Sequence, residues 1–179
     1  MCMPQVDEEL FMNALQTLIA LDSQWVPESP SALYVRPTMI ATQAGLGVAA
    51  ADKYLFFILI GPVGSYFSGG IKPLRLKVEE EFVRSAKGGV GYAKTGGNYA
   101  ASLLPIKRAK DEGFDQIIWL DAETRSTVEE MGAMNIAFVY EDKIITAPLG
   151  DTILHGVTRD SVGVLCQDFG HNWTETPPN

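Results

Sequence analysis

The stretch GGVGYAKTGGNY, residues 88–99, places one lysine, Lys94, among five glycines. Glycines let a bulky ligand approach the backbone closely, because they carry no side chain. A lysine amine acts as a nucleophile when it is neutral, and desolvation or a neighbouring cation favours the neutral form. An exposed loop lysine, with glycines that serve only turns, fits the same residues. This stretch alone therefore leaves a reactive lysine and a plain loop open, and the surrounding chain has to distinguish them.

A second chemical interpretation is a phosphate-binding loop, because Gly88 to Thr95 fits the pattern GxxxxGK[ST] except at Ala93, where the pattern has glycine. Such a loop lies between a buried strand and the N-terminus of a helix. The stretch EEEFVRSAKG that leads into Gly88 is too charged for a buried strand. Gly96 and Gly97 follow directly, so we expect no helix to begin at Thr95. Both expectations argue against nucleotide binding.

Composition sets outer limits on the function. The 179 residues are 46% hydrophobic, which suits a single globular domain with a sizeable core. The net charge of −8 argues against nucleic-acid binding and a basic membrane-binding surface. Cys2 and Cys166 have no neighbouring Cys or His at ligand spacing, so we expect neither a disulfide nor a metal site. No apolar run approaches the roughly 18 to 20 residues that span a bilayer. We expect a soluble, intracellular protein, in the cytoplasm in preference to the mitochondrion.

Helices and strands follow one another irregularly along the chain. Residues 7–21 repeat apolar residues at helical spacing, and residues 158–169 form a second helix after a turn at Gly156. The apolar run YLFFILI, residues 54–60, is typical of a strand buried on both faces. Pro37 places the strand 32–41 at an edge or breaks it. We also expect a loop at 61–70 and a helix at 99–112 that Pro105 kinks or breaks. Strands are expected at 114–120, 133–140 and 143–146, with a tight turn at Glu141 and Asp142 between the last two. No final strand is obvious after them. The pattern indicates an α+β (mixed α/β) fold.

Five motifs occur in a fixed order: YVRPT (34–38), GPVGSYFSGG (61–70), YAKTGGNYAAS (92–102), EEMGAMN (129–135) and LHGVTRDS (154–161). In that order they resemble the motifs of branched-chain amino-acid aminotransferases, which belong to the class-IV pyridoxal-phosphate-dependent aminotransferases. Residues 130–159 also resemble the broader class-IV pattern, from Glu-x-small-x-x-Asn to Gly-Val-Thr-Arg. Ala137 departs from that pattern, which has an aromatic residue there, and we expect the change to affect strand packing rather than chemistry.

The resemblance implies the large cofactor-binding domain of a fold-type IV aminotransferase, incomplete at both ends. Residues 1–30 would be a helix and linker that lead from an N-terminal domain outside the chain. Residues 31–179 would be a partial large domain, with an interdomain loop at about 61–70. The smaller N-terminal domain of the family, with its phosphate-binding arginine, is not matched, and neither is the C-terminal stretch that completes the site.

The same resemblance implies a site for pyridoxal 5′-phosphate. Lys94 would carry this cofactor as a Schiff base and act as the acid and base in proton transfer. Glu130 would pair with the pyridine nitrogen, although Glu129 offers the same carboxylate one position away, and either could be an exposed acid at the end of a strand. Tyr99 would donate a hydrogen bond to the 3-oxygen of the cofactor. Without the resemblance, Tyr99 fits an ordinary core tyrosine.

The remaining cofactor contacts that the resemblance implies come from residues 154–158. Leu154 would pack on a face of the cofactor ring. Gly156, Val157 and Thr158 would bind the phosphate with backbone N–H groups and a hydroxyl at the N-terminus of a helix, where the helix dipole favours an anion. A plain helix cap at Thr158 fits the same residues and is compatible with that role.

The substrate contacts implied by the resemblance lie in three motifs. Tyr34 would lie near the substrate carboxylate, and Arg36 would help to build that site or hold its loop by a structural hydrogen bond. Tyr66 would close over the aliphatic side chain of the substrate. Ala133 stands where some family members have threonine, so the backbone would contact the carboxylate there instead of a hydroxyl.

The activity implied is transfer of the amino group of leucine, isoleucine or valine to 2-oxoglutarate, in the biosynthesis or catabolism of branched-chain amino acids. This chain would be a fragment or short isoform of an enzyme that is a homodimer at full length. The alternative is a catalytically inactive interaction protein that keeps the large-domain fold. Both interpretations expect no nucleic-acid or membrane partner.

Overall fold

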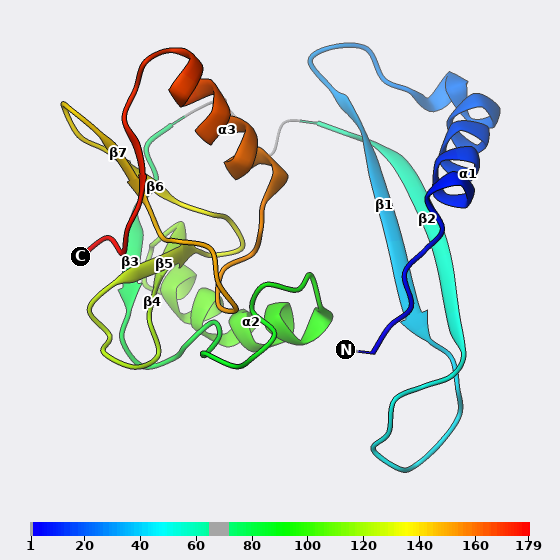
Figure 1. The fold of residues 1–179 in the computed structure, drawn as a ribbon, viewed down its shortest axis with the longest axis horizontal. Helices are drawn as coiled ribbons and strands as arrows, with labels where there is room; N and C mark the ends of the chain where they lie inside the picture. Colours follow the sequence, from blue (N-terminus) through cyan, green and yellow to red (C-terminus); the bar gives the residue numbers. More distant parts are fainter. Residues whose placement is uncertain (1, 65–71) are drawn as a thin grey trace. The chain divides into compact units, whose positions relative to one another are not determined.

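The computed structural model describes residues 2–64 and 72–179, and Figure 1 shows their fold. Contacts divide the chain into two compact units, Met1–Lys72 and Pro73–Asn179. The boundary between them follows the interdomain loop expected at 61–70, and Tyr66 in that loop lies outside the described residues. The division expected at residue 30 stays a prediction from the resemblance.

The N-terminal unit begins with helix α1, Glu8–Leu21, and a short 3-10 helix, η1, Ser23–Trp25. The Asp7 side chain caps α1 by accepting a hydrogen bond from the Leu10 N–H at 2.8 Å. Phe11 of α1 packs against Phe56, with ring centroids 6.0 Å apart. The helix predicted at 7–21 is confirmed, and its apolar face contacts the strand that carries Phe56.

An antiparallel pair of strands, β1 (Ala32–Ala41) and β2 (Tyr54–Val63), completes this unit. The sheet contains these two strands in the described residues, so each has one unpaired edge. Such an edge accommodates Pro37, which lies opposite Ile58 in the register. The prediction of an edge strand at 32–41 is therefore confirmed.

Two predictions about β2 are wrong. Burial on both faces does not occur, since Leu55 and Leu59 are 50% and 54% exposed, whereas Phe56 on the opposite face packs on α1. The one helix of this unit that packs on the two strands covers only one of their two faces. The loop expected at 61–70 also begins later, because residues 61–63 pair with residues 32–34 and extend the strand.

The C-terminal unit is built on two three-stranded sheets. In the first, β4 (Gln116–Leu120) lies between β3 (Leu76–Glu79), which is parallel to it, and β5 (Val128–Met131), which is antiparallel. In the second, β7 (Ile144–Thr146) lies between β6 (Ala137–Val139), which is antiparallel, and β8 (Trp173–Glu175), which is parallel. The crossovers contain helices α2 (Gly96–Asp111) and α3 (Val157–Asp168), as parallel pairs require. None of the described helices is long and apolar enough to cross a bilayer.

The core of this unit forms where α2 packs on β4. Ala109, Ile117 and Trp119 are at most 1% exposed, and Phe82, Ile106 and Phe114 pack against them. The Trp119 indole N–H donates to the Gly132 carbonyl at 2.8 Å, which satisfies its one buried polar group. This bond ties the core to the residues that follow β5.

The end of the glycine-rich stretch and the helix that follows it differ from the expectations. Helix α2 begins at Gly96, with Thr95 as its N-cap, because tertiary packing outweighs the low helix propensity of glycine. The break expected at Pro105 does not occur, because α2 continues through this buried residue, whereas the alternative of a kink there stays a prediction. The described residues still lack the buried strand of a phosphate-binding loop, since β3 ends at Glu79, well before the glycines.

The first and the last strand of the second sheet, β6 and β8, differ from the prediction. The strand expected at 133–140 begins at Ala137, because Gly132 adopts a φ of +55° and a bridge between Met131 and Met134 turns the chain. A final strand, absent from the sequence-based expectation, is supplied by β8. The tight turn at 141–142 is confirmed, with the Tyr140 N–H donating to the Lys143 carbonyl at 2.8 Å.

Asp121 organises the loop between β4 and β5. One carboxylate oxygen accepts hydrogen bonds from the backbone of Glu123 and Thr124, and the other from the backbone of Ser126 and Thr127. These bonds, the largest effect being that of the Thr124 N–H, hold the pKa of Asp121 well below its ordinary value of 3.8. The ionised carboxylate therefore stabilises the fold above that value, and the stabilisation is lost as the pH falls below it.

We expect Asp121→Asn to lower the free energy of unfolding by about 1 to 3 kcal/mol near pH 7, because the amide accepts fewer of these bonds. The difference from the wild type should shrink when urea unfolding is repeated near pH 3, since part of the stabilisation by the wild-type carboxylate is lost below the ordinary pKa of 3.8. Asp142→Asn, in the exposed turn after β6, is the control and should change stability by less than about 0.5 kcal/mol. A difference that stays the same at both pH values would contradict the assignment to the Asp121 charge.

Candidate functional site

Lys94 lies in the loop that leads into α2, and its side chain is exposed. Its Nζ lies 5.7 Å from the centroid of the Tyr99 ring, within the range of a cation–π contact. The Asn98 amide donates to the carbonyls of Val90 and Ala93, at 2.8 and 2.9 Å, and so fixes the loop that precedes the lysine. Tyr99 projects from the first turn of α2, and its hydroxyl is buried without a hydrogen-bond partner among the described residues.

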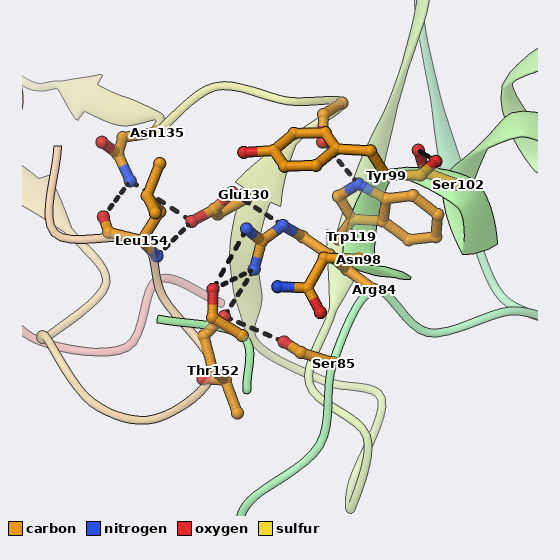
Figure 2. A network of polar contacts seen from close by, with 12 residues as sticks. Arg84, Ser85, Asn98, Tyr99, Ser102, Trp119, Glu130, Asn135, Thr152 and Leu154 are labelled. Atoms are coloured by element: carbon orange, nitrogen blue, oxygen red, sulfur yellow. Dashed lines mark hydrogen bonds and ion pairs between the residues drawn. The ribbon is translucent and has the colours of Figure 1, made fainter. Parts of the chain in front are cut away.

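Glu130 on β5 is paired with a buried arginine, Arg84. The Arg84 Nε lies 2.9 Å from Glu130 Oε2, and the two side chains are 4% and 1% exposed. The other guanidinium nitrogens donate to the Thr152 carbonyl at 2.7 Å and to the Gly91 carbonyl at 3.3 Å. Figure 2 shows the guanidinium between Glu130 and Thr152. One arginine thus connects β5 to the segments on either side of the candidate site.

The second oxygen of Glu130 binds the chain near Leu154. Oε1 accepts hydrogen bonds from the Leu154 N–H at 2.8 Å and from the Asn135 amide at 3.3 Å. The same amide donates to the Leu154 carbonyl at 3.0 Å, so Asn135 and Glu130 together hold both backbone polar groups of this residue (Figure 2). The carboxylate therefore fixes the backbone just before α3.

Burial raises the pKa of the Glu130 carboxyl above its ordinary value of 4.5, even though Arg84, the Leu154 N–H and Lys94 act in the opposite direction. Burial also raises the pKa of Glu129, whose Oε2 is buried and has no hydrogen-bond partner among the described residues. The two neighbouring carboxylates differ in their partners. Glu130 has an arginine and two N–H donors, which makes it the better fixed of the two.

Helix α3 has an N-terminus that no side chain of the described residues caps. Gly156 is its N-cap and offers no side-chain acceptor to the N–H groups of Val157 and Thr158. Behind them, the Arg159 guanidinium donates to the Ala147 carbonyl at 2.9 Å and pairs with Glu175 of β8 at 3.0 Å. The free N–H groups and the helix dipole make this a suitable position for an anion.

A cavity of about 770 Å³ lies in the C-terminal unit. It is lined by six residues expected from the sequence, which are Lys94, Ala133, Leu154, Gly156, Val157 and Thr158. Glu130 and Tyr99 do not line the cavity, but Glu130 binds Leu154, which does, and the Tyr99 ring contacts the lysine. In residues 2–64 and 72–179, no group of three or more His, Cys, Asp or Glu side chains could hold a metal ion.

The expected substrate residues are divided among three parts of the chain. Tyr34 and Arg36 lie on β1 in the N-terminal unit, where the Arg36 guanidinium donates to the Tyr34 hydroxyl oxygen at 2.6 Å. Ala133 lines the cavity of the C-terminal unit. Tyr66 lies outside the described residues.

Two residues of the site are not predicted from the sequence, Arg84 and Asn135. Arg84 lies in a stretch of acidic and basic residues that is typical of a solvated surface, so its sequence gives no sign of burial. Asn135 ends the motif EEMGAMN, and its place in that motif is the signal that could have identified it. The contacts across the chain give both residues their roles.

Replacement of Gly156 by alanine should disturb this arrangement. A Cβ atom on Gly156 would collide with the side-chain oxygen of Asn135, whose amide holds Glu130 and Leu154. We expect Gly156→Ala to lower the free energy of unfolding by about 1 to 3 kcal/mol, measured by urea unfolding. Gly150→Ala is the matched control, because its Cβ would meet no atom within 4 Å. Equal effects of the two substitutions would exclude the collision as the cause.

Residues 1–177 match the protein family described as Amino-transferase class IV. Among curated proteins, the chain is 47% identical over 171 residues to branched-chain-amino-acid aminotransferase 2 of Bacillus subtilis (strain 168), covering 95% of this chain and 47% of the relative. It is 49% identical over 175 residues to a probable branched-chain-amino-acid aminotransferase of Streptomyces coelicolor, covering 97% and 48%. The chain thus spans about half the length of these relatives.

Solved structures of branched-chain aminotransferases are also similar to this chain. The branched-chain aminotransferase of Thermoproteus uzoniensis, crystallised with norvaline, is similar with a TM-score of 0.79 and 27% identity, covering 98% of this chain and 56% of that one. The branched-chain amino acid aminotransferase of T.th., complexed with N-(5′-phosphopyridoxyl)-L-glutamate, is similar with a TM-score of 0.80 and 26% identity, covering 99% and 56%. The fold class expected from the sequence, a partial fold-type IV domain, is confirmed by these structures.

Proposed function

Since the chain belongs to the class IV aminotransferase family, we propose that it forms part of a branched-chain amino-acid aminotransferase that uses pyridoxal 5′-phosphate. The reaction is transfer of the amino group of leucine, isoleucine or valine to 2-oxoglutarate. The observation that carries the proposal is one cavity lined by Lys94 and the uncapped start of α3, with the buried carboxylate of Glu130 bound to its wall at Leu154. The names of the relatives supply the substrate class.

The residues around the cavity fit this cofactor. The buried Tyr99 hydroxyl has no partner among the described residues and can donate to the 3-oxygen of the ring. Glu130 offers a carboxylate to the ring nitrogen, and the N–H groups of Val157 and Thr158 offer donors to the phosphate. Leu154 supplies an apolar contact for a ring face. When bound, the cofactor supplies an electron sink for negative charge at the substrate α-carbon.

Lys94 holds the cofactor covalently and later serves as the base and acid of the reaction. With the cofactor bound, its Nζ would be the group that takes a proton from the substrate α-carbon and returns one on the cofactor side. The exposed position of Lys94 gives substrate access to the amine. Tyr99 orients that amine through the contact with its ring.

Tyr34, Arg36, Tyr66 and Ala133 complete the proposal as substrate contacts. The hydrogen bond between Arg36 and Tyr34 supports a shared role for that pair near the substrate carboxylate. An apolar pocket separates leucine, isoleucine and valine weakly, because one methylene contributes about 1 to 3 kcal/mol. The proposal also includes a homodimer, and light scattering, which measures the mass of the protein in solution, tests it. The proposed location is the cytoplasm.

Formation of glutamate from 2-oxoglutarate tests the proposed reaction. The purified chain is mixed with pyridoxal phosphate and supplied with leucine, isoleucine or valine, or with aspartate as the control amino donor. We expect glutamate with the three branched donors and little with aspartate. Binding of pyridoxal phosphate without amino transfer would contradict the reaction for this chain and favour an inactive interaction protein. A preference for aspartate would contradict the substrate class.

A further inference from the structure

We propose that Arg84 is a positioning residue of the cofactor site, which holds the Glu130 carboxylate ionised and oriented toward the ring nitrogen. This inference rests on the proposed function, because it concerns the group that Glu130 would bind. Arg84 does not line the cavity, and its effect therefore passes through Glu130.

The described residues use only part of the acceptor capacity of Glu130. A carboxylate has two oxygens with about two acceptor positions each. Oε1 already accepts from the Leu154 N–H and the Asn135 amide, whereas Oε2 binds the Arg84 Nε alone among the described residues. One acceptor position thus remains on Oε2, beside the guanidinium. The carboxylate thus keeps acceptor capacity for one further N–H donor, such as a protonated ring nitrogen.

The charge of Glu130 also depends on its arginine partner. At 1% exposure, the carboxylate has lost the water that normally stabilises its ionised form, and burial favours the neutral acid. A neutral acid carries an O–H group and would no longer serve purely as an acceptor. The adjacent guanidinium, which stays protonated in proteins, opposes this change. Arg84 therefore preserves the form of Glu130 that can accept from a protonated ring nitrogen.

The contacts of residue 84 require the side chain of arginine. Its planar guanidinium contacts Glu130 and the Thr152 carbonyl (Figure 2) and, at the same time, the Gly91 carbonyl. Gly91 lies three positions before Lys94, and Thr152 lies two before Leu154. Lysine would supply the charge but not the fixed fork of donors. The three contacts fix the position of the Glu130 carboxylate relative to the segment before Lys94 and the segment before Leu154.

Two ligands that differ at one atom test this role. The probes are pyridoxal phosphate and its 1-deaza analogue, in which a C–H group replaces the ring nitrogen while the aldehyde and the phosphate remain. Their dissociation constants are measured by fluorescence titration of the full chain. We expect Arg84→Met to weaken pyridoxal phosphate about tenfold or more and to leave the analogue nearly unchanged, because only the former uses Glu130. An equal loss for both ligands, or no loss for either, would overturn the proposal.

Two further variants keep the test decisive. Arg84→Lys retains the positive charge and should fold even where the methionine variant does not. It should lose a smaller factor, about two- to tenfold, again for pyridoxal phosphate alone, and an equal loss for both ligands would overturn the proposal. Arg108→Met, which removes an exposed arginine paired with Glu81, should leave both affinities unchanged. If the wild type binds neither ligand, the proposed function fails, and that result is distinct from a loss of selectivity in the Arg84 variants.

Discussion

Replacement of Lys94 by alanine should abolish covalent attachment of pyridoxal phosphate to this chain. In residues 2–64 and 72–179, Lys94 is the lysine that lines the cavity with the uncapped N-terminus of α3, so its amine is the one placed to react with an aldehyde whose phosphate binds there. Borohydride reduction followed by peptide mass spectrometry should locate the adduct on Lys94 in the wild type and find none in the variant. Amino transfer should fall by at least about 10² to 10⁴-fold, the contribution of one positioned acid–base group.

Lys87→Ala is the matched control for that experiment. Lys87 is also exposed and directly precedes the glycine-rich stretch, but it does not line the cavity. Its replacement should leave both the adduct and the amino transfer as in the wild type. An adduct that is lost in Lys87→Ala, or that persists in Lys94→Ala, would show that Lys94 is an ordinary surface lysine.

Glu130→Ala should produce the largest loss of stability in the C-terminal unit. The substitution leaves the Arg84 guanidinium buried without a counter-charge and leaves the Leu154 N–H without its acceptor. Breaking a buried ion pair by removing one partner costs about 3 to 5 kcal/mol. Urea unfolding followed by tryptophan fluorescence, which includes buried Trp119, measures the loss. Affinity for pyridoxal phosphate should fall as well, because the ring nitrogen loses its acceptor.

Glu129→Ala provides the control and decides which of the two neighbouring carboxylates is the essential one. Glu129 is only partly buried, burial raises its pKa, and one of its oxygens has no partner among the described residues. Its removal relieves an unfavourable burial and should change the free energy of unfolding by less than about 1 kcal/mol. A larger loss at Glu129 than at Glu130 would show that Glu129, and not Glu130, is the essential carboxylate.

The glycine-rich stretch illustrates where local inference fails. Gly96 and Gly97 have low helix propensity, and for that reason the sequence predicts no helix at Thr95. The structure begins α2 there, because the helix buries Ser102, Pro105 and Ala109 against the rest of the unit. Packing of distant residues on β4 determines this boundary, and no property of the glycines themselves reveals it.

Arg84 and Glu130 illustrate the same limit within the site. Each lies in a charged stretch whose composition suits a surface, yet both are almost fully buried. The strand β5, which carries Glu130, is not predicted either, because VEEM lacks the apolar alternation of a typical strand. Burial of a charge requires a partner from another part of the chain. Pairing of this kind is visible only when residues distant in sequence are brought together.

The sequence by itself determined the features that depend on short-range order and on motif identity: helix α1, the turn between β6 and β7, the turn at Gly156 that leads into α3, and the family. These follow from local spacing, capping and turn chemistry, or from residues compared one by one. The tertiary structure alone decided that Arg84 is buried against Glu130, that α2 begins among glycines, and that β2 is covered on one face. Each of these depends on which distant segments pack together, and burial and pairing across the chain outweigh local preference there.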